Sequence, residues 1–270
     1  MTYEPRKFGR VRNAALLASA IAWVLLLFDS GGTALVAHCL TAAGATPRPA
    51  SFQMLLAMNP PAALAIGWAV MLVAMMAPVL IAPICHIHLR SFTSRRTRSA
   101  ALFVSAYAAV WMALGCGLLT ISLAAAWFAP QSYLPAAGAA IVALVWQASP
   151  IKQRCLNACN AHKELAAFGV AADYSAVRFG LTHAVWCAGS CWVLMLFPIL
   201  LFRGHLPAMA VVTILISSER LDPPMVARWR WRGLSRVSRI AIAQARIRLQ
   251  SVNPVSASLT APLRTSQEDG

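Results

Sequence analysis

The stretch FGLTHAVWCAGSCWVLMLFPILLF, residues 179–202, decides the fold of this chain. It carries no Asp, Glu, Lys or Arg over 24 residues. A helix needs about 20 mostly apolar residues to cross the hydrocarbon core of a bilayer. We therefore expect this stretch to be a transmembrane helix.

Five other stretches have the same apolar character, and they indicate a membrane protein. The chain has 270 residues, of which 59% are hydrophobic and 11% are charged. Soluble domains average about 45–50% apolar and about 25% charged residues, so lipid must cover part of this surface. We predict an all-α, polytopic membrane helical bundle of about six transmembrane helices, with the other spans at residues 13–28, 62–89, 100–129, 134–149 and 205–218.

Basic residues predict the orientation of the spans. Of 23 Lys and Arg residues, 21 lie in the N-terminal segment, the second and fourth loops and the C-terminal segment. Because cytoplasmic loops are enriched in Lys and Arg, we expect both termini in the cytoplasm and a multi-pass protein of the bacterial inner membrane.

The C-terminal part has a different character from the predicted bundle at residues 1–225. Residues 226–250 are basic and amphipathic, with Trp between Arg residues, which predicts a helix lying on the anionic inner leaflet. A solvated basic face is the alternative. Residues 251–270 are polar and predict a disordered tail. Because the membrane explains this charge, we expect no nucleic acid partner.

Soft metal ligands recur at helical spacing in two segments. Cys155, Cys159 and His162 share an arc of about 60° on a helix expected over residues 151–168. On the fifth span, His183 precedes Cys187 and Cys191 at successive steps of four residues. Two thiolates and an imidazole on one face suit a soft metal ion. The alternative is structural, because Cys is also a common small packing residue between helices.

The predicted topology brings further candidates to the same cytoplasmic side. Met75, Cys85 and His86 lie on the second span, which descends towards that side, and Glu219 ends the sixth span there. Thioether and thiolate donors together favour Cu(I) over harder ions. Methionine also fills packing gaps, and this role is at least as favoured for Met71 and Met76 on the same span. Glu219 could form an ion pair with Arg220 or a neighbouring arginine.

Several motifs resemble one bacterial family. They are WAVM at 68–71 with AMMAP at 74–78, PIK at 150–152 with Cys-Leu-x2-Cys at 155–159, CAGSCWxLM at 187–195, and Glu219-Arg220 closing a span. In this order they resemble a family of integral membrane proteins of uncharacterised function that are predicted to bind metal. The resemblance covers roughly residues 60–225, and it implies an all-helical membrane fold with suspected metal ligands.

These observations favour a membrane protein that handles a soft transition metal, with copper preferred, and that is not an enzyme. The alternative is a non-catalytic scaffold or assembly factor for a partner complex in the membrane. A thiol redox protein ranks last, because cysteines four residues apart on a helix are poorly placed for a disulfide. Hydrolytic catalysis finds little support, because paired carboxylates are absent from the predicted spans and no Ser-His-Asp grouping is evident.

Overall fold

The computed structural model describes residues 5–29, 60–129, 132–161, 165–166, 168–201 and 203–231. In this part of the chain, eight helices and no strands form, which confirms the all-α prediction. Their bounds are α1 Pro5–Asp29, α4 Pro61–Met76, α5 Ile81–Arg90, α6 Arg96–Phe128, α7 Leu134–Ala148, α8 Pro150–Asn160, α9 Gly169–Leu200 and α10 His205–Arg220.

Three helices are long and apolar enough to cross a membrane, and they cover Gly9–Phe28, Arg96–Phe128 and Gly169–Leu200. Two further pairs, α4 with α5 and α7 with α8, qualify together but bend by 76° and 67°. Each pair is either a broken span or a re-entrant loop, so the described residues hold three to five candidate spans. The remaining α10 has only 16 residues. Six spans, and the side on which each terminus lies, stay predictions.

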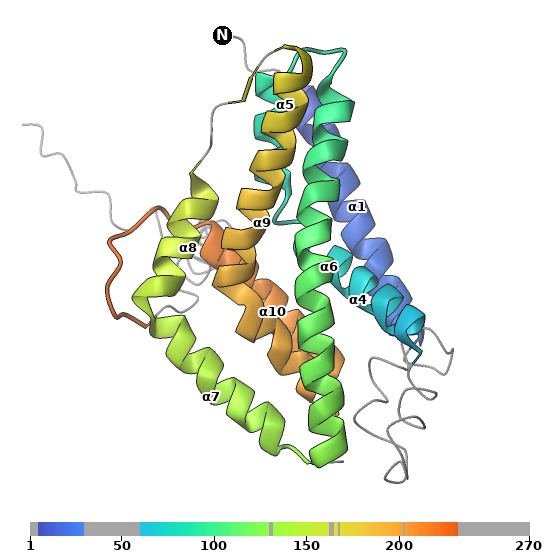
Figure 1. The fold of residues 1–270 in the computed structure, drawn as a ribbon, viewed down its shortest axis with the longest axis vertical. Helices are drawn as coiled ribbons and strands as arrows, with labels where there is room; N and C mark the ends of the chain where they lie inside the picture. The colour runs from blue at the N-terminus through green and yellow to red at the C-terminus, as the bar shows by residue number, and fades with distance from the viewer. Residues whose placement is uncertain are drawn as a thin grey trace, which may run out of the picture. The chain divides into compact units, whose positions relative to one another are not determined.

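Helices α6 and α9 form the centre of the bundle and run side by side (Figure 1). They approach closely at Gly180, where a methyl group would lie 2.6 Å from the carbonyl oxygen of Phe103. At the start of both helices, Arg98 pairs with Asp173 at 2.8 Å. The two helices are therefore parallel.

Proline ends the regular helix at both bends. Pro78 lacks the N–H that would continue α4, and the chain turns through residues 77–80 before α5 begins. Pro150 begins α8 in the same way, and the Ser149 hydroxyl caps the new helix by accepting from the Lys152 backbone N–H at 3.1 Å.

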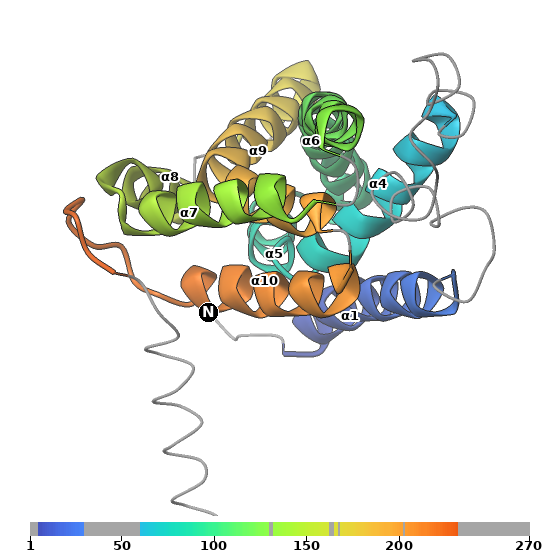
Figure 2. The ribbon, with the colours of Figure 1, turned by 90° about the horizontal axis from the view of Figure 1, so that it is seen from below.

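Two helix boundaries differ from the sequence prediction. The helix expected over residues 151–168 ends at Asn160, so α8 is shorter than its apolar pattern indicated. The fifth span begins at Gly169, ten residues before Phe179, because the polar turn at its start continues the same helix. Seen from below, α7 and α8 lie along one side of α9, and α10 also packs on α9 (Figure 2). Helix α8 thus joins the bundle.

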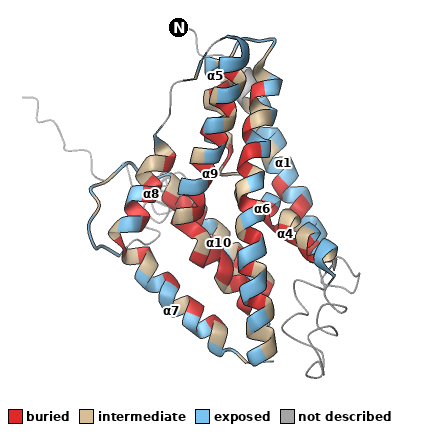
Figure 3. Cartoon of the chain, viewed as in Figure 1, coloured by how far each residue is buried: buried red, intermediate tan, exposed pale blue. Residues whose placement is uncertain are grey.

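Burial follows this arrangement, with buried residues concentrated along α9 and the inner faces of α6 and α4 (Figure 3). Helices α1 and α7 instead expose large apolar side chains such as Leu17, Leu25, Ile141 and Val145. Exposed apolar surface on this scale is costly in water and is compatible with a membrane protein. The predicted surface segment and tail, residues 226–250 and 251–270, lie almost wholly outside the described residues.

Candidate metal site

Helix α9 carries the predicted row of donors on a single buried face. His183, Cys187, Cys191 and Met195 are all less than a tenth exposed. The row forms because α9 is helical throughout this stretch, so residues four apart lie above one another. Within the row, the thiol of Cys191 donates to the backbone oxygen of Cys187 at 3.0 Å.

Helix α8 brings the second pair of thiols against α9. Cys155 and Cys159 are each 6% exposed and lie on the buried face of α8. A methyl group at Gly189 of α9 would lie 2.9 Å from the Cys155 sulfur. The missing side chain at Gly189 therefore allows the Cys155 side chain to contact the backbone of α9.

Cys187 interacts with cysteines on two helices. The Cys187 thiol interacts electrostatically with the thiols of Cys159 on α8 and Cys191 on α9. All three cysteines are free of disulfides. We call Cys159, Cys187 and Cys191 the thiol cluster. The two rows expected from their spacing thus converge, although they are separated by 28 residues between Cys159 and Cys187.

Two polar groups from other helices contact the same sulfur. The hydroxyl of Tyr107 on α6 lies 3.3 Å from Cys187 Sγ. Arg220, the last residue of α10, donates from Nη2 to Cys187 Sγ at 2.9 Å and to Ser190 Oγ at 3.3 Å. Four helices therefore supply the surroundings of one thiol.

A buried ion pair lies beside Arg220. Lys152 is fully buried and pairs with Glu219 at 2.8 Å, and the Gln147 side chain hydrogen-bonds to both. The alternative role given to Glu219 was an ion pair with Arg220 or a neighbouring arginine, whereas the structure pairs it with Lys152. Among the described residues, Arg220 has sulfur and hydroxyl partners and no carboxylate.

Aromatic rings surround the histidine of the α9 row. The ring centre of His183 lies 5.8 Å from those of Phe103 and Phe179 and 6.1 Å from that of Tyr107. Phe179 also packs edge-on against His86 of α5, at 5.9 Å. One aromatic ring thus lies between the two histidines.

The other predicted donors lie on α4 and α5 or outside the described residues. Met75 is fully buried on α4, in the same hydrophobic core as the thiol cluster. Cys85 is partly buried on α5. His162 lies outside the described residues, so its predicted alignment with Cys155 and Cys159 stays a prediction.

The described residues contain no group of three or more His, Cys, Asp or Glu side chains arranged to hold a metal ion. This excludes a preformed tetrahedral centre of the zinc type in that part of the chain. A site in which two thiolates hold a soft metal ion is compatible with this finding, because Cu(I) can be coordinated by only two donors.

Sequence reasoning did not place Tyr107 and Arg220 beside Cys187, nor Gln147 and Lys152 beside Glu219. One signal was available for two of them: an ionisable residue at the edge of a span is a functional candidate. Lys152 and Arg220 meet that description, but from the sequence they were interpreted only as orientation signals, as parts of the family motifs and, for Arg220, as a possible partner of Glu219. Tyr107 and Gln147 carry no such signal in the sequence.

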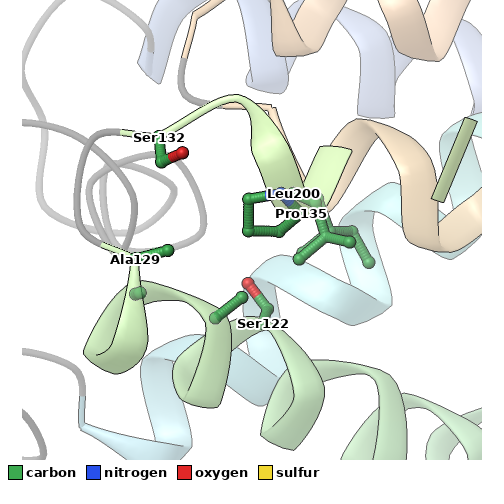
Figure 4. A pocket seen from close by; sticks show the side chains of 8 residues that line it. Ser122, Ala129, Ser132, Pro135 and Leu200 are labelled. Atoms are coloured by element: carbon green, nitrogen blue, oxygen red, sulfur yellow. The ribbon is translucent and has the colours of Figure 1, made fainter. Parts of the chain in front are cut away.

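A small pocket lies elsewhere, between the end of α6, the start of α7 and the end of α9 (Figure 4). Ser122, Ala129, Ser132, Pro135 and Leu200 line it, and its volume of about 20 Å³ holds about one water molecule. No cysteine, histidine or methionine is among its lining residues. The thiol cluster is therefore a packed site, separate from this pocket.

The comparison with protein families gives one match. The PpoB2 family, described as a copper chaperone, matches residues 65–242, a range that contains Met75, both cysteine pairs and Arg220. No curated protein and no solved structure matches the chain. The matched range is 178 of 270 residues, well over half of the sequence. The chain belongs to the PpoB2 copper chaperone family.

Proposed function

We propose that this protein binds Cu(I) as cargo at the thiol cluster, inside a helical bundle embedded in the bacterial inner membrane. The observation that carries the proposal is the buried, free thiol of Cys187, which interacts with Cys159 on α8 and with Cys191 on α9. Family membership supports copper handling in general, and the apolar helices support a membrane location.

The chemistry of the cluster suits Cu(I). Thiolates are soft donors and favour Cu(I), and reducing cytosol keeps thiols free to bind it. Cys187 is common to both interacting thiol pairs, with Cys159 and with Cys191. Coordination by Cys187 and one of these partners needs no third donor. The buried surroundings exclude water, which limits oxidation of the ion and of the thiols.

The role that follows is binding and handover, without covalent chemistry. Because Cys187 contacts two other thiols, an ion held by one pair can pass to the other by exchanging a single sulfur ligand. Cys155, on the same face of α8 as Cys159, offers a further thiol towards the start of that helix. A chaperone family is in keeping with a non-catalytic role.

The test is Cu(I) binding by purified protein in detergent, under reductant and without oxygen, against a chromogenic Cu(I) chelator. We expect Cys187→Ser to cause the largest loss of affinity, because it removes the sulfur common to both pairs. Cys159→Ser and Cys191→Ser should each cause a smaller loss. Cys116→Ser is the matched control, because Cys116 is exposed on α6 and should not contribute.

Equal Cu(I) affinity in the Cys187→Ser and Cys116→Ser proteins would refute the proposal. It would favour the scaffold alternative, in which the cysteines pack helices and a membrane protein partner covers the apolar surface. That alternative predicts a stoichiometric partner after mild crosslinking and no bound metal. We also propose that the basic segment at residues 226–250 binds the anionic lipid of the inner leaflet.

A further inference from the structure

Arg220 is an ionised side chain whose nearest partners are sulfur and hydroxyl groups. Its Nη2 donates to Cys187 Sγ at 2.9 Å and to Ser190 Oγ at 3.3 Å. The adjacent Glu219 already forms an ion pair with Lys152, at 2.8 Å between Nζ and Oε2. The pair of Lys152 and Glu219 is neutral, so the arginine leaves one positive charge beside the thiol cluster.

That charge is costly where it lies. The Arg220 Nε atom is buried without a hydrogen-bond partner among the described residues. Burying an ionised group is unfavourable unless an opposite charge compensates it. The nearest atom that can carry a negative charge is Cys187 Sγ, in the thiolate form that binds metal.

We propose that Arg220 sets the charge balance of the copper site and thereby makes it select a monovalent ion over a divalent one. The inference rests on the proposed function and names the residue that gives it specificity. Two thiolates, one Cu(I) ion and the guanidinium sum to zero charge. With Zn²⁺ in the same place, the sum is one positive charge, which the low-dielectric interior disfavours.

The contact with Cys187 survives metal binding. A thiolate sulfur has several lone pairs, so Cys187 can accept from Arg220 on one side and bind the ion on another. Hydrogen bonds from charged donors to anions are about twice as strong as neutral ones. Arg220 would therefore hold the sulfur in place and balance its charge, without itself binding the ion.

The experiment compares Cu(I) and Zn²⁺ affinities of the full chain in detergent, each against a chelator of the corresponding ion. In Arg220→Gln, the site with two thiolates and Cu(I) gains a net negative charge, whereas the same site with Zn²⁺ becomes neutral. We expect Cu(I) affinity to fall by about 10- to 100-fold, the loss for a hydrogen bond to a charged group. Zn²⁺ affinity should hold or rise. Arg220→Lys keeps the charge and should keep the wild-type ratio.

A second route to the same charge change leaves the arginine in place. Ser190→Asp puts a carboxylate beside Nη2, which gives Arg220 an ordinary ion-pair partner. We expect the ratio of Cu(I) to Zn²⁺ affinity to fall as it does in Arg220→Gln. Ser190→Ala is the matched control, since it removes the hydroxyl without changing charge and should leave the ratio unchanged.

The outcomes separate the two proposals. If the wild-type protein binds no Cu(I), the proposed function fails and the role of Arg220 fails with it. If it binds Cu(I) but Arg220→Gln and Ser190→Asp weaken both ions equally, Arg220 has a structural role and only this inference is overturned. An Arg220→Lys protein that behaves like Arg220→Gln would overturn it too, because charge would then not decide the selectivity.

Discussion

Replacement of Gly180 by Ala tests the packing of the two central helices. A methyl group there would lie 2.6 Å from the Phe103 carbonyl oxygen, 2.9 Å from Ala106 Cβ and 3.2 Å from Phe103 Cα. Two of these three atoms belong to the backbone of α6, so no rotamer change can relieve the contact. To restore ordinary van der Waals spacing, α6 and α9 must move apart by about 1 Å.

The magnitude follows from two opposing terms. Overpacking of a close interface costs about 1–3 kcal/mol, and contact with fixed backbone atoms places Gly180→Ala towards the upper end. The substitution also gains about 1 kcal/mol of helix propensity. We expect a net loss of about 1–2 kcal/mol in the free energy of unfolding.

The assay is unfolding of detergent-solubilised protein by SDS titration, followed by far-UV circular dichroism. Gly117→Ala on α6 is the matched control, because nothing lies within 4 Å of a methyl group at that position. It should gain about 1 kcal/mol from helix propensity alone. Equal unfolding midpoints for the two variants would refute the close approach of α6 and α9 at Gly180.

The remaining predictions concern buried and partly exposed charges. Glu219→Gln leaves the fully buried Lys152 without its counter-charge and should cost about 3–5 kcal/mol in the same titration, and the double variant Lys152→Met with Glu219→Leu should recover most of the loss. Recovery of less than half of the lost free energy would show that the ion pair stabilises the fold beyond neutralising its own two charges. Asp173→Asn removes the pair with Arg98, which is 65% exposed, and a longer one with Arg95 at 3.9 Å. Because these pairs are near the surface, the loss should be under about 1 kcal/mol, and high salt should abolish their contribution in the wild-type protein. A larger, salt-insensitive loss would contradict this assignment.

Sequence alone predicts the membrane class, the helical fold and the face on which the thiols lie. The absence of charge over residues 179–202 and the four-residue steps between His183, Cys187 and Cys191 depend only on local helical geometry. The bends were partly predictable, because Pro78 and Pro150 interrupt apolar stretches. The direction taken by the chain after each bend was not, since it depends on which neighbour the new helix packs against.

The contacts around Cys187 could not be predicted, because they depend on the relative placement of helices. Tyr107 and Cys187 are 80 positions apart, and Arg220 follows Cys187 by 33. No local pattern indicates that the hydroxyl and the guanidinium reach the same sulfur. The ion-pair partner of Glu219 could not be predicted for the same reason. Arg220 is adjacent to it in the sequence, yet Lys152, 67 positions away, forms the contact.

The structure joins these separate features through α8. The break at Pro150 turns this helix by 67° from α7, and the lack of a side chain at Gly189 lets Cys155 contact α9. The same short helix carries Lys152, whose pairing with Glu219 ties α8 to the end of α10. Because Arg220 is the next residue, any movement of α8 that separates Cys159 from Cys187 also strains the ion pair that positions the guanidinium. The thiols and their compensating charge are thus held by one set of contacts, so a partner that displaced α8 would loosen both together.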